Sequence, residues 1–489
     1  MRSVALIPLL LSICLFPRLA RGADKPLNFI VILVDDLGWM DLSCQGSDYY
    51  RTPNVDRLAQ EGLRFTNGYA ACAVCSPTRA ALQTGRYPGR IGVTDWIRSM
   101  FQRGGLGTPE KNPTDYVGGP GRKLLCPPNP YWMEHDEVTI AEALRENGYS
   151  TGYIGKWHLG DEAWYPTGQG YDENRGGCDY GQPPSYFDPF NQPKHKHPMI
   201  RAGIPFLPGR KKGEFLTHRE ADEAVKLIRD WKDRPFFLQV SHYAVHTPIQ
   251  AIESVAAKYR REGRNEINAK YAAMVESFDD STKAILNTLE EVGIDDRTVI
   301  LFTSDNGGLD HGGRPTENAP LRSGKGYPYE GGIRVPFIVR WPGVIKPGSV
   351  SDDMVCSIDV LPTLLEAAGV AAPDDRTIDG LSLVEHLKSS GKQPLGRDEL
   401  LWHFPHYRHA PGPYSIIRKG DWKLIRWDEG ISELYDLKSD LSETTNLAEK
   451  KVDKLAELDG LLTARLKSMD ARLPRLNPQW KGRKQLSPE

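Results

Sequence analysis

The chain has 489 residues, of which 39% are hydrophobic and 26% charged, and its formal net charge at pH 7 is -2. These values are typical of a soluble globular protein and do not indicate binding to nucleic acid or to a membrane surface. The length exceeds what one hydrophobic core usually supports, so we expect a large domain followed by a smaller one.

The first 22 residues differ from the rest. Arg2 precedes an apolar run from residue 4 to 16, and the small residues Ala20 and Gly22 follow. This order is typical of a cleaved signal peptide. This apolar run is too short to span a membrane, and no later segment has the roughly 20 apolar residues of a membrane-spanning helix. We therefore expect a secreted or periplasmic protein. The chain lacks an Asn-x-Ser/Thr acceptor for N-glycosylation, which favours a bacterial envelope over a eukaryotic secretory route. A lipoprotein anchor at Cys14 is a weaker alternative.

The cysteines do not form a disulfide framework. Seven are present, and five remain when Cys14 and Cys75 are set aside. We expect at most two disulfides and at least one free thiol. The five are Cys44, Cys72, Cys126, Cys178 and Cys356.

Apolar, β-branched runs alternate with helical patterns over the first three quarters of the chain. This alternation predicts an α/β fold with a large, mostly parallel mixed sheet flanked by helices on both faces. Strands are expected at 28–34, 151–154, 236–241, 298–303 and 335–341. Helices are expected at 53–61, 138–147, 217–231, 266–292 and 358–368, each ending near a glycine or a turn signal.

Two long segments, 100–133 and 160–213, are rich in Gly, Pro and aromatic residues and are predicted to be ordered loops. After residue 390 the pattern changes to short strands at 414–418, 422–427 and 433–437, followed by a helix at 446–469. We therefore predict a signal peptide at 1–22, an α/β domain at 23–390, and a smaller α+β domain at 391–489 with a short antiparallel sheet.

Polar side chains follow two of the predicted strands. Asp35 and Asp36 end the first, and Asp305 and Asn306 follow the strand at 298–303. In open α/β sheets, ligands bind beyond the carboxyl ends of strands. Such an all-oxygen set suits Ca²⁺ or Mg²⁺ rather than zinc. The alternative for an isolated Asp-Asp pair is a helix cap or a turn.

The segment Cys75-Ser76-Pro77-Thr78-Arg79, followed by a short helix at 80–86, resembles the formylglycine sulfatases. In that family the Cys-x-Pro-x-Arg segment is recognised by the enzyme that converts the cysteine to formylglycine. Cys72 and Cys75 could instead form a redox or zinc pair, or Cys75 could be a buried thiol. The chain has no second Cys-x-x-Cys segment for zinc.

The resemblance extends over nearly the whole mature chain and implies a set of site residues. Asp35, Asp36, Asp305 and Asn306 match the metal ligands of the family, and an oxygen of the modified Cys75 would complete the shell. Six residues are expected to act on the sulfate ester: Cys75, Arg79, Lys156, His158, His246 and Lys325. Lys156 and His158 are two apart, so on an extended segment they would face the same way.

Each of these residues has an ordinary alternative role. A single lysine such as Lys156 is usually a solvated surface charge, and a single histidine such as His246 is usually a hydrogen-bonded loop residue. Their joint occurrence, in the order that the family shows and at the ends of predicted strands, favours the site. The segment 329–336 also matches the family and is expected to be structural.

The resemblance implies a hydrolase of sulfate monoesters, with a sulfated carbohydrate as substrate and Ca²⁺, or alternatively Mg²⁺, as the ion. It assigns proton donation to the leaving alcohol to His246, and assistance of the sulfate elimination to His158. The alternatives are a phosphodiesterase or phosphonate hydrolase of the same superfamily, and a non-catalytic carbohydrate-binding relative. The last would be expected to have lost nucleophile or metal ligands.

Other polar residues are weaker candidates. Trp96 and His311 follow segments of the site and are expected to contact substrate. Two basic runs, 194–197 and 210–212, are expected to be solvated loop charges. Three histidines before the C-terminal strands are expected on surface loops or, alternatively, at the substrate mouth: His403, His406 and His409.

Overall fold

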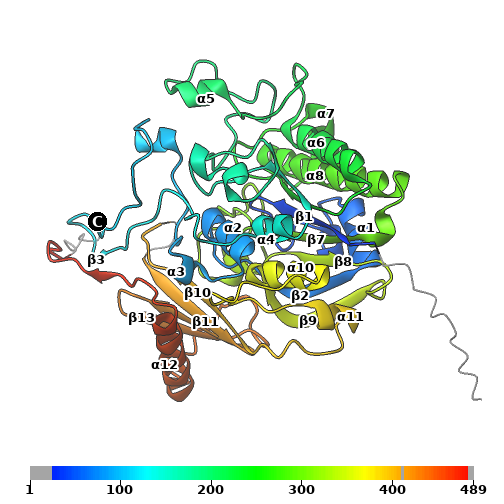
Figure 1. The fold of residues 1–489 in the computed structure, drawn as a ribbon. Coiled ribbons are helices and arrows are strands. Elements are labelled where there is room, and N and C mark those ends of the chain that lie inside the picture. Colours follow the sequence, from blue (N-terminus) through cyan, green and yellow to red (C-terminus); the bar gives the residue numbers. More distant parts are fainter. Residues whose placement is uncertain (1–24, 409–411, 483–489) are drawn as a thin grey trace, which may run out of the picture.

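The structure is a computed structural model that describes residues 25–408 and 412–482, so the predicted signal peptide, Cys14 and His409 lie outside it. A central sheet contains β1 (Asn28–Val34), β2 (Leu63–Tyr69), β4 (Ser150–Gly155), β5 (Glu173–Arg175), β6 (Phe236–Ser241), β7 (Thr298–Ser304), β8 (Phe337–Arg340) and β9 (Ser349–Cys356). Their order is β5-β4-β6-β1-β7-β8-β2-β9, and Figure 1 labels β1, β7, β8, β2 and β9 of this sheet. In this described sheet β8 runs antiparallel to both neighbours and the other pairings are parallel. The predicted fold class is confirmed.

The central strands are apolar because both faces of the sheet are covered. Every residue of β1, β6 and β7 is buried, which is the pattern that parallel strands inside an α/β fold require. The sequence prediction missed β2 and β9. Polar residues interrupt both strands, including Asn67 in β2 and the pair Asp352 and Asp353 in β9. β9 is an edge strand of the sheet, so one of its two edges has no neighbouring strand in this described sheet.

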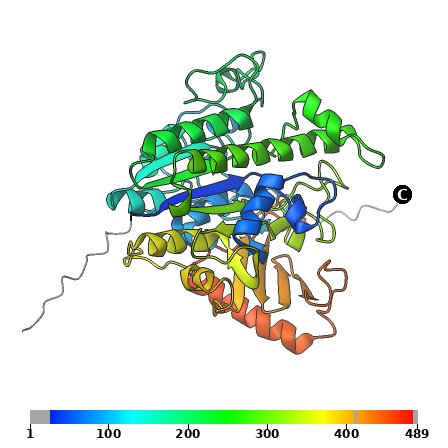
Figure 2. The same ribbon diagram turned by 90° about the vertical axis from the view of Figure 1, so that its right-hand side faces the viewer.

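Helices lie on both faces of the sheet (Figure 2). The longer ones are α1 (Pro53–Glu61), α2 (Cys75–Thr84), α4 (Ile140–Glu146), α6 (Leu216–Trp231), α8 (Glu266–Glu291) and α10 (Val360–Ala368). α6 and α8 pack together over one face, and α2, α4 and α10 pack against one another on the other. Short helices are α3 (Pro88–Ile91), α5 (Pro198–Ala202), α7 (Glu253–Ala256), α9 (Glu330–Ile333) and α11 (Val384–Lys388).

Capping explains where two predicted helices begin. α4 starts two residues after the predicted position because Thr139 is its N-cap. The Thr139 hydroxyl accepts from the Glu142 N–H over 3.1 Å, and the Glu142 carboxylate accepts from the Thr139 N–H over 2.8 Å. Asn265 caps α8 through its side chain, which accepts from two backbone N–H groups. Such reciprocal bonds satisfy backbone donors that have no partner within the helix.

A second sheet follows, with antiparallel strands β10 (Glu399–Phe404), β11 (Tyr414–Lys419), β12 (Trp422–Trp427) and β13 (Ile431–Asp436). The sequence prediction missed β10. The final helix, α12 (Val452–Ser468), contacts β11 and β12. It begins six residues later than predicted because the Asn446 side chain accepts from the N–H groups of Leu434 and Ala448, which holds that segment in a turn.

Buried polar contacts join the second sheet to the rest of the chain. The Trp402 indole N–H donates to the Ala70 carbonyl over 2.7 Å. The Lys423 ammonium lies 3.0 Å from Glu330 and 2.8 Å from Glu443, and all three side chains are fully buried. Glu330 begins α9, so these ion pairs agree with a structural role for the segment 329–336. The domain boundary near residue 390 stays a prediction.

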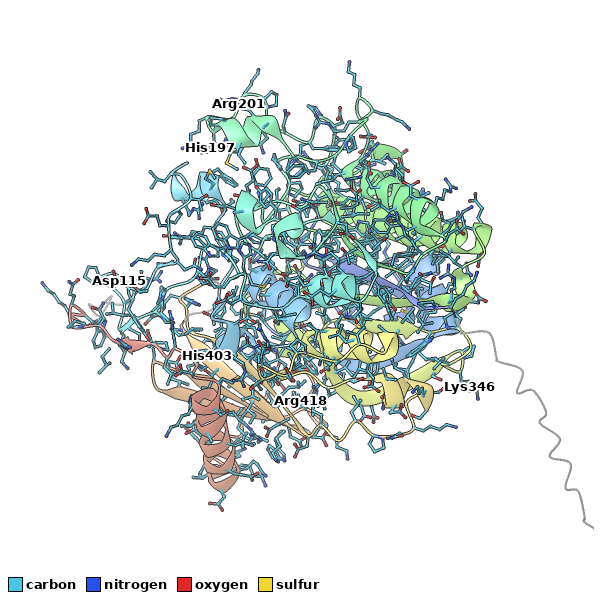
Figure 3. All side chains as sticks on the ribbon, in the orientation of Figure 1. Asp115, His197, Arg201, Lys346, His403 and Arg418 are labelled. Carbon is cyan, nitrogen blue, oxygen red and sulfur yellow. The ribbon has the colours of Figure 1, made fainter. Side chains whose placement is uncertain are left out.

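The predicted loops are largely without regular structure. The loop at 100–133 holds β3 (Leu124–Leu125), which pairs with β14 (Arg475–Leu476). The loop at 160–213 holds β5 and α5. Figure 3 shows His197 and Arg201 at the α5 end of the molecule, and His403 and Arg418 toward the second sheet.

Two further expectations concern thiols and membranes. Within the described residues all six cysteines are free, and five of them are buried, in keeping with the expected scarcity of disulfides. In the same part of the chain, the structure contains no helix with the length and apolar character needed to cross a membrane.

Candidate active site

The polar side chains predicted from two strand ends lie together in the structure. Asp35 and Asp36 follow β1, and Asp305 and Asn306 follow β7. The two strands are parallel neighbours in register, so their carboxyl ends meet at the edge of the sheet where α/β proteins bind ligands. All four side chains are buried. The Asn306 amide donates to Asp36 Oδ1 over 2.8 Å, which joins the two pairs.

This cluster has the oxygen atoms that a hard cation requires. Oδ1 of Asp35 and Oδ1 of Asn306 are buried and have no hydrogen-bond partner among the described residues, which is uncommon for buried polar atoms. Ligand atoms of Asp35, Cys75 and Asp305 all lie within 4.8 Å of one another. Carboxylate and amide oxygens are the ligands that Ca²⁺ and Mg²⁺ prefer. The residues present therefore fit a divalent cation of this type.

The carboxylates differ in their electrostatic surroundings. Burial raises the pKa of Asp35 well above its usual value, and Asp305 adds to the rise although Lys156 opposes it. Burial acts on Asp36 in the same direction, but Lys325 and other cationic groups outweigh it and lower the pKa of Asp36. A cation beside Asp35 would relieve the repulsion between the carboxylates.

Both predicted lysines contact this cluster. The Lys156 ammonium donates to Asp35 Oδ2 over 2.7 Å and is fully buried. The Lys325 ammonium lies 2.7 Å from Asp36 Oδ1 and 2.9 Å from Oδ2. Lys156 follows β4, and its N–H donates to the Ser241 carbonyl at the end of β6. The site thus uses the carboxyl ends of four neighbouring parallel strands.

Cys75 lies at the first position of α2, which begins five residues earlier than the predicted helix at 80–86. Ser76 anchors this turn, because its hydroxyl donates to the His158 carbonyl over 2.9 Å and accepts from the Ile97 N–H over 2.9 Å. Burial raises the pKa of the Cys75 thiol, although Lys156 and other cations oppose the rise. A protonated thiol is a weak nucleophile, so an unmodified Cys75 is poorly suited to attack an ester.

Arg79 lies one turn further along α2 and is buried. Its Nε donates to Asp305 Oδ2 over 2.7 Å, and its Nη1 donates to the Lys156 carbonyl over 2.5 Å. Burial raises the pKa of Asp305, but Arg79 together with Lys156 and Lys325 outweighs this effect, and the pKa is lowered. Arg79 therefore joins the Cys75 helix to the acidic cluster.

The expectation that Lys156 and His158 lie on an extended segment is wrong. β4 ends at Gly155, and His158 has a φ of 63°, in the left-handed region. The turn separates the two side chains. The Lys156 ammonium points to Asp35, whereas the His158 ring lines a cavity.

The hydrogen bonds of the two histidines define which ring nitrogen carries a proton. His158 Nε2 lies 2.7 Å from the Ile97 carbonyl, and His246 Nδ1 lies 2.9 Å from the Thr247 carbonyl. A carbonyl only accepts, so each of these nitrogens carries its hydrogen. The other nitrogens, His158 Nδ1 and His246 Nε2, are then acceptors when the ring is neutral. Burial lowers both pKa values, to about 3 for His246, where Lys325 adds to the effect.

His246 reaches the cluster because the loop after β6 is tied to β1. The Asp35 N–H donates to the Ala244 carbonyl over 2.9 Å, and the Val245 N–H donates to the Asp35 carbonyl over 2.7 Å. These bonds place His246 Nε2 3.6 Å from Asp36 Oδ2. The sequence did not predict this approach of His246 to Asp36.

The site opens into a cavity of 310 Å³. It is lined by four of the predicted residues that act on sulfate, namely Cys75, His158, His246 and Lys325, and by the two predicted substrate contacts, Trp96 and His311. Arg79 and Lys156 do not line it. The lining residues that sequence reasoning missed include Phe101, Gln102, Gln182 and Arg408. The first three lie in the predicted loops at 100–133 and 160–213, and no motif marked Arg408.

The C-terminal histidines differ from the expectation. His403 is in β10 and buried, with ring contacts to the Ser415 hydroxyl and the Arg472 carbonyl. His406 is also buried and lies 2.8 Å from the Thr94 hydroxyl. The expectation of surface loops is wrong for both, because the missed strand β10 places His403 within the second sheet and His406, two residues after its end, against Thr94.

Known proteins resemble this chain over most of its length. The Sulfatase family model matches residues 27–370, and the model of the N-sulphoglucosamine sulphohydrolase C-terminal region matches residues 324–472. A protein of Formosa agariphila described as a sulfatase is 34% identical over 496 residues, which cover 87% of this chain and 85% of that protein. The N-acetylgalactosamine-6-sulfatase of Mus musculus is 35% identical over 393 residues, with coverages of 77% and 69%.

Several solved structures also resemble this chain over most of its length. That of Ps i-CgsB has a TM-score of 0.77 and 28% identity over 93% of this chain and 95% of its own, and the protein has also been solved with k-i-k-neocarrahexaose. The phosphonate monoester hydrolase of Agrobacterium radiobacter, with a TM-score of 0.63 and 22% identity over 92% of this chain and 97% of its own, shares the fold alone. The resemblance found in the sequence is confirmed: the chain belongs to the sulfatase family of the alkaline phosphatase superfamily, a family of sulfuric ester hydrolases that generally use formylglycine and a divalent metal.

Proposed function

We propose that this protein hydrolyses sulfate monoesters of carbohydrates, with Cys75 converted to formylglycine and Ca²⁺ held by Asp35, Asp36, Asp305 and Asn306. The observation that carries the proposal is the position of Cys75. It begins α2, its sulfur lies within 4.8 Å of two carboxylates of the cluster, and it lines the cavity. A carbohydrate substrate is supported by the names of the relatives, which include an N-acetylgalactosamine-6-sulfatase.

Formylglycine would supply a hydroxyl nucleophile that a buried thiol cannot, and the divalent cation would supply positive charge beside the sulfate oxygens. The chain's own cations act around this position. The Lys325 ammonium lines the cavity and would pair with a sulfate oxygen. Lys156 and Arg79 lie behind it and balance the buried carboxylates. Charges fixed in advance stabilise a reaction in which negative charge develops on the leaving alkoxide.

The two histidines fit opposite proton-transfer roles. His158 is neutral and carries its proton on Nε2, so its Nδ1, which has no partner among the described residues, can accept a proton within the cavity. This arrangement supports a role as the base that assists release of sulfate. His246 lines the same cavity and donates Nδ1–H to a carbonyl, so only its protonated form can donate from Nε2. The negative charge of a bound sulfate ester would favour that form, which supports His246 as the acid for the leaving alcohol.

Maturation and export complete the proposal. Cys75 is only 3% exposed and belongs to a buried helix turn, so a formylglycine-generating enzyme must act before α2 folds into place. The apolar segment within residues 1–22 would direct the chain to the periplasm or outside the cell.

Two measurements test the proposed function. Peptide mass spectrometry over residues 73–79 should detect formylglycine in place of Cys75. Hydrolysis rates on nitrophenyl sulfate should exceed those on nitrophenyl phosphate diesters and phosphonates by orders of magnitude. Faster turnover of the phosphorus esters would favour the phosphodiesterase or phosphonate hydrolase alternative, and an unmodified Cys75 in a fully active preparation would contradict the proposed nucleophile.

A further inference from the structure

A second cavity of 570 Å³ adjoins the candidate active site. Trp96 and Arg408 line both cavities, so they form the shared wall. The second cavity is built from residues 95–98, from residues 113–131 of the predicted loop at 100–133, and from residues 406–408 after β10. Both volumes are in the range of small-molecule sites. The second cavity therefore lies next to the position of a ligand in the first, on the other side of Trp96 and Arg408.

The second cavity is positively charged. Arg98, Arg122 and Arg408 line it, and among the described residues Asp95 is its one acidic lining residue. The Asp95 carboxylate accepts from Arg408 Nε over 2.8 Å, so these two charges balance each other. Arg98 and Arg122 are exposed and form no ion pair within the described part of the chain. Two uncompensated guanidinium groups thus face the cavity.

Aromatic rings hold these arginines in position. The guanidinium of Arg122 lies 4.7 Å from the centre of the Tyr407 ring, and that of Arg98 lies 5.9 Å from the Trp96 ring. Such cation–π contacts restrict the side chains without occupying their hydrogen-bond donors. A guanidinium is a planar fork that matches the oxygens of a sulfate or a carboxylate. The cavity therefore presents oriented donors for an anionic group.

We propose that the second cavity binds an anionic group on a sugar next to the one that loses its sulfate. The proposal rests on the proposed function, and it makes the substrate an oligosaccharide or polysaccharide with charges on neighbouring units. A small aryl sulfate fills the first cavity alone and does not reach Arg98 or Arg122. The anionic group is a sulfate or a carboxylate, which share the geometry that a guanidinium recognises.

The test compares the wild type with the double variant Arg98→Gln/Arg122→Gln, in which neither changed residue lines the first cavity. Hydrolysis of nitrophenyl sulfate is inhibited with three hexasaccharides: ι-carrageenan, which carries sulfates, unsulfated chondroitin, which carries carboxylates, and neutral neoagarohexaose. Arg229→Gln serves as the control, because Arg229 is exposed on α6 and pairs with Glu291 away from both cavities.

In the wild type, at least one anionic hexasaccharide should inhibit more strongly than the neutral one. The double variant should raise the inhibition constant of that hexasaccharide about tenfold, as expected for charged hydrogen bonds at partly exposed sites. Its KM for nitrophenyl sulfate and its melting temperature should match those of the wild type and Arg229→Gln. The anionic hexasaccharide whose inhibition constant rises more in the double variant identifies the anion bound in the second cavity as sulfate or carboxylate.

The proposal is overturned if the double variant keeps the inhibition constants of the wild type, or if the neutral hexasaccharide inhibits as well as both anionic ones. If the proposed function itself is wrong, the result is different: the wild type does not hydrolyse nitrophenyl sulfate. In that case, direct binding of the three hexasaccharides, measured by calorimetry on both proteins, still decides whether the second cavity selects anions.

Discussion

Arg79 and Asp305 form a buried hydrogen-bonded ion pair, with 2.7 Å between Nε and Oδ2, although 226 positions separate them in the chain. Arg79 belongs to α2, the helix that begins with Cys75, whereas Asp305 follows β7. The pair fixes that helix against the acidic cluster. It also helps to keep Asp305 charged, because Arg79, Lys156 and Lys325 together outweigh the effect of burial and lower the pKa of Asp305. The position of Cys75 therefore depends on the cluster, and the cluster depends on α2.

The first prediction concerns the nucleophile. Cys75→Ala should abolish turnover of nitrophenyl sulfate without changing the far-UV circular dichroism spectrum, because alanine fits the first turn of α2 and lacks the thiol that would be converted to formylglycine. Cys72→Ala is the matched control, since Cys72 is an equally buried thiol three residues away. It should keep activity within a few-fold of the wild type. Equal loss in both variants would instead favour a redox or metal pair of cysteines.

The second prediction concerns the cation. Exhaustive chelation should remove activity and lower the melting temperature by a few degrees, and Ca²⁺ should restore both, because a ligand at a hundred times its Kd adds about 3 kcal/mol to the free energy of unfolding. Asn306→Ala should weaken this response, since it deletes one buried oxygen of the cluster. Asp41→Asn is the control: the Asp41 carboxylate already accepts from Tyr271, Thr316 and Gly38. Its response to Ca²⁺ should match the wild type.

The third prediction separates the histidines. His246→Gln should lower kcat on a carbohydrate sulfate by about 10² to 10⁴, the usual contribution of a general acid. On nitrophenyl sulfate the loss should be much smaller, because nitrophenolate leaves without protonation. His158→Gln should slow both substrates, since release of sulfate is common to them. A uniform loss in His246→Gln across leaving groups would argue against its role as the acid.

The fourth prediction concerns stability and pH. Burial lowers the pKa of His403 from 6.5 to about 4, so the unfolded chain binds a proton that the folded chain does not between these values. The free energy of unfolding should therefore fall as pH decreases from 6.5 to 4, with about 2 kcal/mol from His403 lost by pH 5. His403→Gln should show a correspondingly weaker dependence of its melting temperature on pH. Parallel curves for variant and wild type would mean that His403 is protonated in the folded state.

The fifth prediction concerns the junction between the two sheets. Lys423→Met leaves Glu330 and Glu443 buried without this cation and should reduce the free energy of unfolding by about 3 to 5 kcal/mol. Lys454→Met, at the exposed pair with Glu457 on α12, should change it by less than about 1 kcal/mol. Urea unfolding of both variants measures the difference. Equal stabilities would show that solvent reaches the Lys423 site.

Local sequence patterns predicted the regular part of the fold well. β1, β6 and β7 are continuous apolar runs because both sheet faces are covered, and such runs are readable without a structure. β2, β9 and β10 were missed. Polar residues in β2 and β9 are tolerated because main-chain pairing to neighbouring strands, not an apolar pattern, defines those strands.

By itself, the sequence determined the family and the residues of the cluster, from Asp35 and Asp36 to the segment that begins with Cys75, because strand ends and short motifs are local in the chain. Only the tertiary structure showed that His158 turns away from Lys156, and that Arg408 reaches the wall between two cavities. These relationships depend on how distant segments pack, through a left-handed turn and a missed strand. The chain position of a residue does not encode such contacts. Cys75 is recognisable from five letters, but its surroundings exist only in the folded chain.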